Sequence, residues 1–210
     1  MRTKQDIQKI KNLFLENFSG AKSELKFKNL YELIVCVMLS AQCTDKRVNL
    51  ITPALFEAYP DIKALAGANL SSLKMFINSC SFFNNKASNL IKMAKSVVEN
   101  FGGEIPLNEK DLTSLAGVGQ KTAHVVLIEH QEANLMAVDT HVFRVSHRLN
   151  LSSAKTPQAT EIDLSKAFKT ELNTLHQAMV LFGRYTCKAV RPRCDECFLQ
   201  SLCKWKDKTI

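Results

Sequence analysis

Apolar residues recur at helical spacing along most of the chain. One short stripe near the N-terminus is formed by Ile7, Ile10, Leu13 and Phe14. A longer stripe runs from residue 90 to residue 101, and residues 30–42 are apolar almost all round, which predicts a nearly buried helix. Residues 122–128 have a strand-like composition, but their position after a Gly-x-Gly turn favours a buried helix. No run of alternating strands is evident, so the pattern predicts an all-α fold.

Polar residues and glycines mark the expected ends of these helices. Asp45 and Asp61 each precede an apolar stretch and are predicted to be N-caps. Gly102 and Gly103 follow the long stripe and are predicted to end its helix. Breaks near Gly20, after the long stripe and at residues 152–153 are too short to act as free linkers. The pattern therefore favours two closely packed lobes.

The charge balance points to a polyanionic partner. The 210 residues include 28 Lys and Arg against 20 Asp and Glu, a net charge of +8. A surplus of this size favours nucleic acid first and an anionic membrane second, although it also fits simple solubility. The first residues lack the apolar core of a signal peptide, and the longest apolar run, residues 33–39, is too short to span a bilayer. We therefore expect a reducing compartment inside the cell.

Residues 111–131 have the pattern of a helical hairpin. Gly117 is predicted to end the first helix with a positive φ, and Gly119 is predicted to keep side chains out of the turn. Gln120 then opens the second helix. Backbone N–H groups that point outward at a helix N-terminus bind phosphate without reading bases. The alternative is a tight structural turn followed by an exposed lysine, and this segment alone does not decide between them.

Lys121 and Asp139 are the candidate catalytic residues. An amine is a nucleophile only when neutral, and both a dry cleft and the positive end of a helix favour the neutral form. Lys121 would meet both conditions if the hairpin faced such a cleft. Asp139 precedes a predicted helix that begins at Thr140, and N-capping alone would explain it. In a cleft that binds DNA, its carboxylate could also stabilise a positive sugar intermediate or help activate a nucleophile.

Four of the seven cysteines are clustered near the C-terminal end with the spacing C-x6-C-x2-C-x5-C. They are Cys187, Cys194, Cys197 and Cys203. Thiolates at this spacing can bind zinc or a [4Fe–4S] cluster, and the spacing does not decide which. No catalytic partner is evident, so we interpret the site as structural. The remaining Cys36, Cys43 and Cys80 lie in apolar surroundings and are expected to be small buried residues.

The loop between the first two of these cysteines is basic. Lys188, Arg191 and Arg193 lie around Pro192, which stiffens the turn. Three cations in a constrained loop suit binding to DNA phosphates. A solvated basic loop is the alternative interpretation.

Several of these motifs together resemble the endonuclease III family of DNA glycosylases, in the helix-hairpin-helix superfamily. The resemblance extends over nearly the whole chain. The matching segments are residues 39–45, 84–87, 115–121, 138–141 and 183–187 and the cysteine tail. The resemblance implies a two-lobed all-α fold, with a six-helix lobe over residues 22–133 and a second lobe from residues 1–21 plus 134–210. It also implies DNA binding between the lobes and a [4Fe–4S] cluster, rather than zinc, on the four cysteines.

The resemblance also implies roles for individual residues. Lys121 matches the nucleophile that forms a Schiff base with the sugar before β-elimination, and Asp139 matches the catalytic aspartate. Gln42 matches a residue that fills the gap left by a flipped nucleotide. Phe82 replaces a frequent leucine wedge and Ser81 a usual glycine, so lesion preference is open. The implied substrate is double-stranded DNA with oxidised pyrimidines or abasic sites. The implied enzyme is a cytoplasmic, nucleoid-associated monomer.

Two other functions are compatible with parts of the pattern. A monofunctional glycosylase for mismatched adenine or alkylated bases would use water as its nucleophile, and Lys121 argues against it. A non-catalytic DNA-binding hairpin with structural zinc would need neither candidate catalytic residue. The joint presence of Lys121 and Asp139 argues against that alternative.

Overall fold

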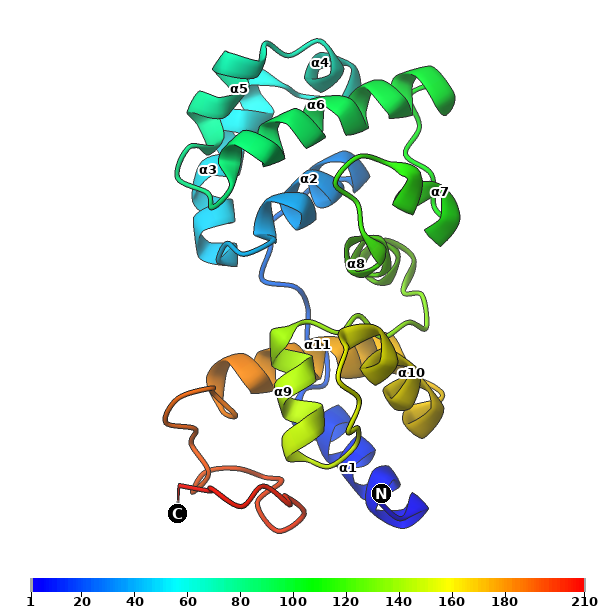
Figure 1. Cartoon of the computed structure of the whole chain (residues 1–210), viewed down its shortest axis with the longest axis vertical. Coiled ribbons are helices and arrows are strands. Elements are labelled where there is room, and N and C mark those ends of the chain that lie inside the picture. The colour runs from blue at the N-terminus through cyan, green and yellow to red at the C-terminus, as the bar shows by residue number, and fades with distance from the viewer. Residues whose placement is uncertain (1, 210) are drawn as a thin grey trace. The chain divides into compact units, whose positions relative to one another are not determined.

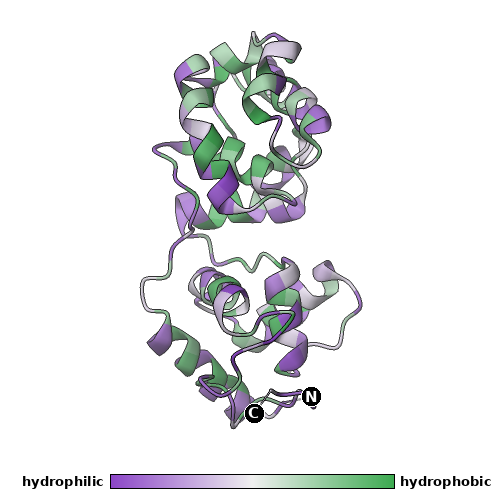
Figure 2. Cartoon of the chain, turned by 90° about the vertical axis from the view of Figure 1, so that its left-hand side faces the viewer, coloured by the Kyte–Doolittle hydropathy of each residue, from purple (hydrophilic) through white to green (hydrophobic). Residues whose placement is uncertain are grey.

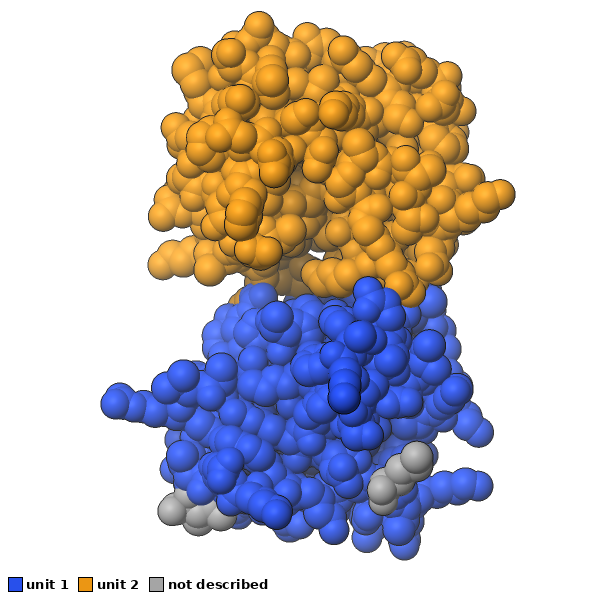
Figure 3. Space-filling view, in the orientation of Figure 1, with its two compact units in different colours: residues 1–22, 132–210 blue, residues 23–131 orange. Residues whose placement is uncertain are grey.

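The computed structural model describes residues 2–209, which form eleven helices and no strand (Figure 1). This confirms the predicted all-α class. Contacts divide the chain into two compact units, one of Ser23–Gln131 and one of Met1–Lys22 with Glu132–Ile210 (Figure 3). Helices of both units carry hydrophobic and hydrophilic residues on the same ribbon (Figure 2), as expected for amphipathic helices around a core. Within residues 2–209, every helix is too short or too polar to span a lipid bilayer.

The unit of residues 23–131 is built around α2. Its helices are α2 (Leu30–Ser40), α3 (Asp45–Ala58), α4 (Ile62–Ala66), α5 (Leu70–Ile77), α6 (Phe83–Asn100), α7 (Glu109–Ser114) and α8 (Gln120–Gln131). Helix α2 is buried from Leu33 to Leu39 and contacts α3, α6 and α8, which confirms the prediction for this segment. The described part of this unit thus has seven helices where the resemblance implies six, and two of them, α4 and α7, have only five and six residues.

Helix ends in this unit follow local rules. Asp61 is the N-cap of α4 and accepts a hydrogen bond from the N–H of Ala64 at 2.8 Å, as predicted. The predicted N-cap of α3 is wrong by one residue. The hydroxyl of Thr44 accepts the hydrogen bond from the N–H of Arg47, and Asp45 is the first helical residue. A carboxylate in the first turn is still favourable, because it faces the positive end of the helix.

In the other unit, α1 (Lys4–Asn17) and α9 (Thr140–Arg148) pack against α11 (Leu172–Tyr185), and α10 (Pro157–Phe168) packs against α1 and α9. Helices α9 and α11 approach closely at Gly183, where an added Cβ would lie 2.9 Å from Cβ of His141. This close contact fixes the start of α9 relative to the end of α11. The chain then continues without a helix or strand from residue 186 to residue 209.

An aromatic cluster attaches that irregular segment to the helices. The ring of Phe198 lies 5.7 Å from that of Phe14 in α1 and 5.2 Å from that of Phe182 in α11. Leu199 is fully buried in the same core. Aromatic pairs at these separations stabilise through both burial and ring geometry. The irregular segment is therefore anchored at its middle, although it has no regular backbone hydrogen bonding.

Candidate functional site

The predicted hairpin is present between α7 and α8. Gly117 has a φ of +79°, a conformation that only glycine adopts freely, as predicted. Val118 is buried, and its N–H donates to the carbonyl of Leu115 at 3.1 Å, which closes the turn. Gln120 is the first residue of α8. The N–H groups of the first turn of α8 therefore lie at the end of a compact, internally bonded turn.

The two glycines of the hairpin meet different surroundings. A Cβ added at Gly117 would lie 2.9 Å from Cβ and Nδ2 of Asn89, so both the φ and the packing require glycine there. A Cβ added at Gly119 would have no atom within 4 Å, and Gly119 is not in the left-handed region. The expectation that Gly119 keeps a side chain out of the turn is therefore wrong. The turn itself has room for one.

Lys121 is the second residue of α8, and its side chain is exposed. The helix becomes buried only two residues later, from Ala123 to Ile128. Nε2 of buried His124 lies 3.0 Å from the carboxylate of Glu109, which links the first turn of α7 to α8. The amine of Lys121 is thus exposed in the first turn of α8, and the helix is held in place by the buried residues that follow.

Asp139 is the N-cap of α9, as predicted. Its Oδ1 accepts a hydrogen bond from the N–H of Val142 at 2.7 Å, and the side chain is half-buried. Within residues 2–209, Oδ2 makes no hydrogen bond. Asp139 belongs to the unit that contains the cysteine segment, whereas Lys121 belongs to the unit of residues 23–131.

Gln42 and Phe82 each lie in a short turn with an unusual backbone. Gln42 has a φ of +53° and follows α2, and Phe82 has a φ of +57° and precedes α6. Such conformations are costly for residues other than glycine and are concentrated at functional sites. Both side chains are exposed, Phe82 to 63%. Buried Lys86 in α6 donates to the carbonyl of Leu39 in α2 at 2.7 Å, so a buried cation joins the helices that carry the two turns.

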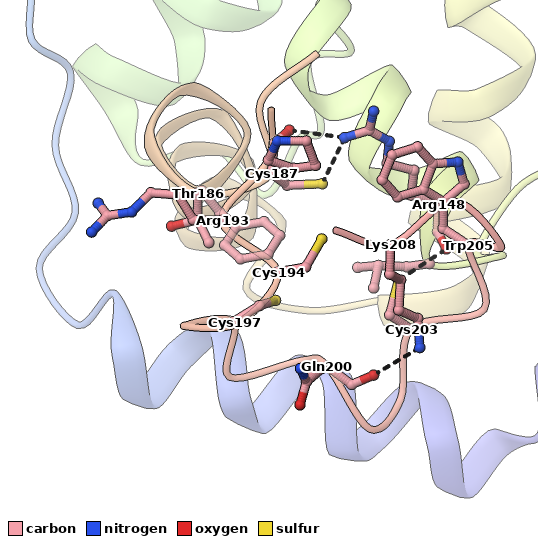
Figure 4. A pocket seen from close by; sticks show the side chains of 13 residues that line it. Arg148, Thr186, Cys187, Arg193, Cys194, Cys197, Gln200, Cys203, Trp205 and Lys208 are labelled. Carbon is pink, nitrogen blue, oxygen red and sulfur yellow. Dashed lines mark hydrogen bonds between the residues drawn. The ribbon is translucent and has the colours of Figure 1, made fainter. Parts of the chain in front are cut away.

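The four clustered cysteines line one pocket (Figure 4). Four thiolates around one zinc ion would lie about 3.8 Å from one another. Within residues 2–209, no three histidine, cysteine or carboxylate side chains are close enough together to hold a single metal ion. A [4Fe–4S] cluster takes each thiolate on a different iron. Four thiols that line one pocket are the donor set that such a cluster needs.

Two arginines of α9, which no sequence motif indicated, hold this pocket. Arg148 of α9 donates to the carbonyl of Lys188 at 2.6 Å and to the sulfur of Cys187 at 3.4 Å, and the ring of Trp205 covers its guanidinium at 3.7 Å. Arg144, one turn earlier, donates to the carbonyl of Cys187 at 3.0 Å. The i, i+4 spacing of the two arginines was visible in the sequence. Nothing in it indicated that this face of α9 would meet the cysteines.

Burial raises the pKa of two of the pocket thiols. For Cys197 the pKa rises to about 11, chiefly by desolvation. For Cys187 desolvation also raises the pKa, and the hydrogen bond and charge of Arg148 oppose it. Metal ligands must be thiolates, so loading such a site releases protons. Arg148 lies where it can stabilise the resulting charge on Cys187.

The basic loop is exposed, but its three cations differ. Lys188 and Arg191 have no acidic partner within the described residues, whereas Arg193 forms an ion pair with Glu196. Arg191 also has a positive φ of 49°, next to buried Pro192. The unpaired charges of Lys188 and Arg191 are therefore the more available for an external anion.

The sequence matches two family models. Residues 35–170 match the HhH-GPD superfamily of base excision DNA repair proteins, and residues 187–203 match the iron-sulfur binding domain of endonuclease III. The second match covers all four clustered cysteines. The segment that forms the pocket is thus similar to a known iron-sulfur domain.

Curated proteins and solved structures agree with these matches. Endonuclease III of Rickettsia felis is 40% identical over 98% of this chain and 97% of its own length, and that of Escherichia coli K12 is 37% identical over 92% of each. A trapped endonuclease III–DNA covalent intermediate is 39% identical with a TM-score of 0.93 over 97% of both chains. A thermostable thymine-DNA glycosylase, 19% identical with a TM-score of 0.86, shares the fold. The chain therefore belongs to the endonuclease III family of base excision DNA repair enzymes.

Proposed function

We propose that this DNA glycosylase and abasic-site lyase uses Lys121 as its nucleophile and Asp139 as its catalytic carboxylate on oxidised pyrimidines in duplex DNA. The family establishes the class of reaction. The observation that carries the residue assignment is the position of Lys121, an exposed amine in the first turn of α8 directly after a phosphate-binding type of hairpin.

The proposed reaction has two steps. The neutral amine of Lys121 attacks C1′ of the flipped nucleotide, the bond from C1′ to the base breaks, and the base leaves with a proton. The C1′–O4′ bond of the sugar then breaks and O4′ takes up a proton from solvent, which leaves a protonated Schiff base between Lys121 and C1′. This Schiff base makes the 2′ hydrogen acidic. Its removal breaks the bond between C3′ and the phosphate oxygen, which cuts the strand on the 3′ side. Because Lys121 is exposed in the free protein, the DNA itself would have to displace water from the amine.

Asp139 is suited to a second role because N-capping uses only one of its oxygens. The bond from Val142 to Oδ1 fixes the orientation of the carboxylate, and Oδ2 is left for the substrate. A preoriented negative charge would stabilise the positive character that develops on the sugar. Capping and catalysis are therefore compatible at this residue.

The free hairpin also supports a phosphate site. Among the described residues, none lies within 4 Å of a Cβ added at position 119, so packing does not require glycine there. A phosphate bound to the N–H groups around Gly117, Gly119 and Gln120 would occupy this space. Phosphate binding would therefore require glycine at position 119. We further propose that Gln42 and Phe82 enter the duplex at the flipped nucleotide, because both are exposed and are held in costly backbone conformations.

The cofactor is a [4Fe–4S] cluster, and we propose that Cys187, Cys194, Cys197 and Cys203 bind it. When bound, the cluster supplies a structural cross-link between four positions of an otherwise irregular segment. That cross-link would hold the loop of Lys188, Arg191 and Arg193 in the form that meets DNA phosphates. The resemblance implies two lobes. The lobe of residues 22–133 would carry the hairpin and Lys121, and the lobe of residues 1–21 plus 134–210 would carry Asp139 and the cluster.

The partner is double-stranded DNA, and DNA is the ligand named for two solved relatives with TM-scores of 0.93. We propose that the enzyme acts as a monomer on chromosomal DNA in the cytoplasm, because a base excision repair enzyme works where the genome lies.

Oligonucleotide cleavage tests the proposed function. A duplex with one thymine glycol should be cut without alkali, leaving a 3′ unsaturated aldehyde. Lys121→Gln should lose this cut while it retains binding to the same duplex and visible absorbance from the cluster. A wild-type enzyme that leaves intact abasic strands, cut only after alkali, would instead support a monofunctional glycosylase.

A further inference from the structure

Two cysteines outside the cluster pocket form a close pair. Sγ of Cys43 and Sγ of Cys80 lie 3.5 Å apart, although the residues are 37 positions apart in sequence. Cys43 is half-buried and Cys80 is 3% exposed. The expectation that Cys36, Cys43 and Cys80 are small buried residues is confirmed for Cys36 and Cys80 and is wrong for Cys43, which solvent can reach. The third cysteine of this unit, Cys36, is fully buried, and its sulfur lies 3.6 Å from the carbonyl of Lys26.

Each thiol is held in the turn that carries a proposed DNA contact. Cys43 directly follows Gln42, and its N–H donates to the carbonyl of Ser40 at 3.0 Å. Cys80 lies two residues before Phe82, and its N–H donates to the carbonyl of Ile77 at 2.9 Å. The pair therefore joins the turn after α2 to the turn between α5 and α6 within one compact unit.

The surroundings of the pair favour thiol exchange. Burial, together with the hydrogen bond and charge of Cys43, raises the pKa of Cys80 to about 11, while Lys86 and Arg47 oppose the rise. Once Cys43 is linked to another sulfur, its charge is lost, but the two nearby cations are still present. The second thiol is then easier to ionise. Cys43 is the accessible thiol and Cys80 the shielded one, an arrangement that suits an attacking and a resolving cysteine.

We propose that Cys43 and Cys80 are a reversible thiol modification site, which a small-molecule disulfide converts to an intramolecular disulfide. The Cys43 thiolate attacks one sulfur of the small disulfide, whose S–S bond breaks, and the departing thiolate takes up the proton that Cys43 lost. Cys80, as a thiolate, then attacks the Cys43 sulfur and releases the second small thiol, which takes the Cys80 proton. The protein loses two electrons and two protons, and the small disulfide gains both.

The modification would act on DNA binding through the two turns. A disulfide needs its sulfurs about 2.05 Å apart, so the turns must move closer and lose their independent motion. Gln42 and Phe82 lie in strained conformations next to the sulfurs, and such positions change when their neighbours move. Oxidation should therefore weaken insertion into the duplex. This consequence rests on the proposed function of Gln42 and Phe82, whereas formation of the disulfide does not.

The test uses the cluster-loaded enzyme without oxygen, treated with oxidised glutathione, alkylated and digested. Wild type and Cys36→Ala should each yield a peptide that links Cys43 to Cys80, with the loss of two hydrogens and unchanged absorbance from the cluster. Cys43→Ala and Cys80→Ala should yield none. Absence of the linked peptide from wild type would overturn the proposal.

Binding to abasic-site DNA is then measured for each protein before and after oxidation. We expect oxidation to lower the affinity of wild type and Cys36→Ala by about tenfold, with full recovery on reduction, and to leave Cys43→Ala unchanged. Cys80→Ala, which lacks the resolving thiol, should instead retain glutathione on Cys43 as a mixed disulfide. A linked wild-type protein with unaltered affinity would overturn the proposed effect of the disulfide on DNA binding. If the reduced enzyme fails to cut DNA at all, the proposed function fails, while the linked peptide still decides the thiol site.

Discussion

The hairpin of residues 109–131 and the cysteine segment of residues 187–203 are both candidates for contact with DNA, but they are held in different ways. The hairpin has two helices, a closed turn and buried apolar residues on its inner side, so its backbone bonds are largely its own. The cysteine segment has no helix or strand. Its carbonyls are bonded by Arg144 and Arg148, and Phe198 anchors it to the helices.

The difference concerns where the stability of each region comes from. Short-range hydrogen bonds and burial of apolar side chains stabilise the hairpin, whether or not the cofactor is bound. The cysteine segment depends on groups distant in sequence and on the metal cluster that its thiols would bind, so its folding is coupled to loading. Loss of the cofactor should therefore affect one region severely and the other little.

The largest expected effect is the loss of a ligand. Cys197→Ala should abolish the broad visible absorbance and lower the free energy of unfolding by about 3–5 kcal/mol, because the segment loses its cross-link. Absorbance, iron content and thermal unfolding measure this. The hairpin should remain folded, as judged by hydrogen exchange in residues 120–131. A colourless wild type that contains zinc would contradict the cluster assignment.

The next effect separates the two hairpin glycines. Gly117→Ala should destabilise the protein by about 1–3 kcal/mol, because a residue with φ of +79° gains a Cβ 2.9 Å from Asn89. Gly119→Ala should change stability by less than about 0.5 kcal/mol and yet weaken DNA binding, since the space around it is open only in the free protein. Equal losses of stability in the two variants would contradict this difference.

Substitution of Arg148 should destabilise the cysteine segment and leave the hairpin unchanged. Arg148→Met removes the hydrogen bonds to Lys188 and Cys187 and the charge beside Trp205, and we expect a loss of about 1–3 kcal/mol. The midpoint potential of the cluster should shift as well, because hydrogen bonds to ligand sulfurs tune it. Arg148→Lys, which keeps the charge but not the planar fork, should be intermediate. An unshifted potential in both variants would show that Arg148 does not act on the ligand.

The smallest effect concerns salt dependence. Arg191→Ala should reduce the slope of log affinity against log salt by about 0.9, the value for one lost phosphate contact. Arg193→Ala should reduce it less, because Glu196 already pairs with Arg193. Titrations between low and moderate salt compare the two variants. If Arg193→Ala reduces the slope more than Arg191→Ala does, the ion pair between Arg193 and Glu196 must break when the protein binds DNA.

The features that the sequence predicted correctly follow from short-range rules. The buried helix α2, the Asp139 cap and the positive φ of Gly117 all depend on residues within a few positions. The cap of α3 was misplaced by one residue because Thr44 and Asp45 are both good capping residues, and only geometry chooses between them.

The features that could not be predicted depend on contacts between distant segments. Arg148 reaches Cys187 across 39 positions, and Cys43 reaches Cys80 across 37. The open space at Gly119 is likewise a property of the folded surroundings. The resemblance supplied ligands and catalytic candidates, but it gave no information about the side chains that surround them.

The most direct test of the central claim is borohydride trapping on DNA that contains an abasic site, followed by peptide mapping. Reduction of the Schiff base should leave a covalent protein–DNA adduct, and the modified peptide should contain Lys121. Lys121→Gln should give no adduct, and Asp139→Asn should form it much more slowly with binding largely intact. An adduct mapped to another amine, or wild-type enzyme that binds the DNA and never forms an adduct, would contradict the account.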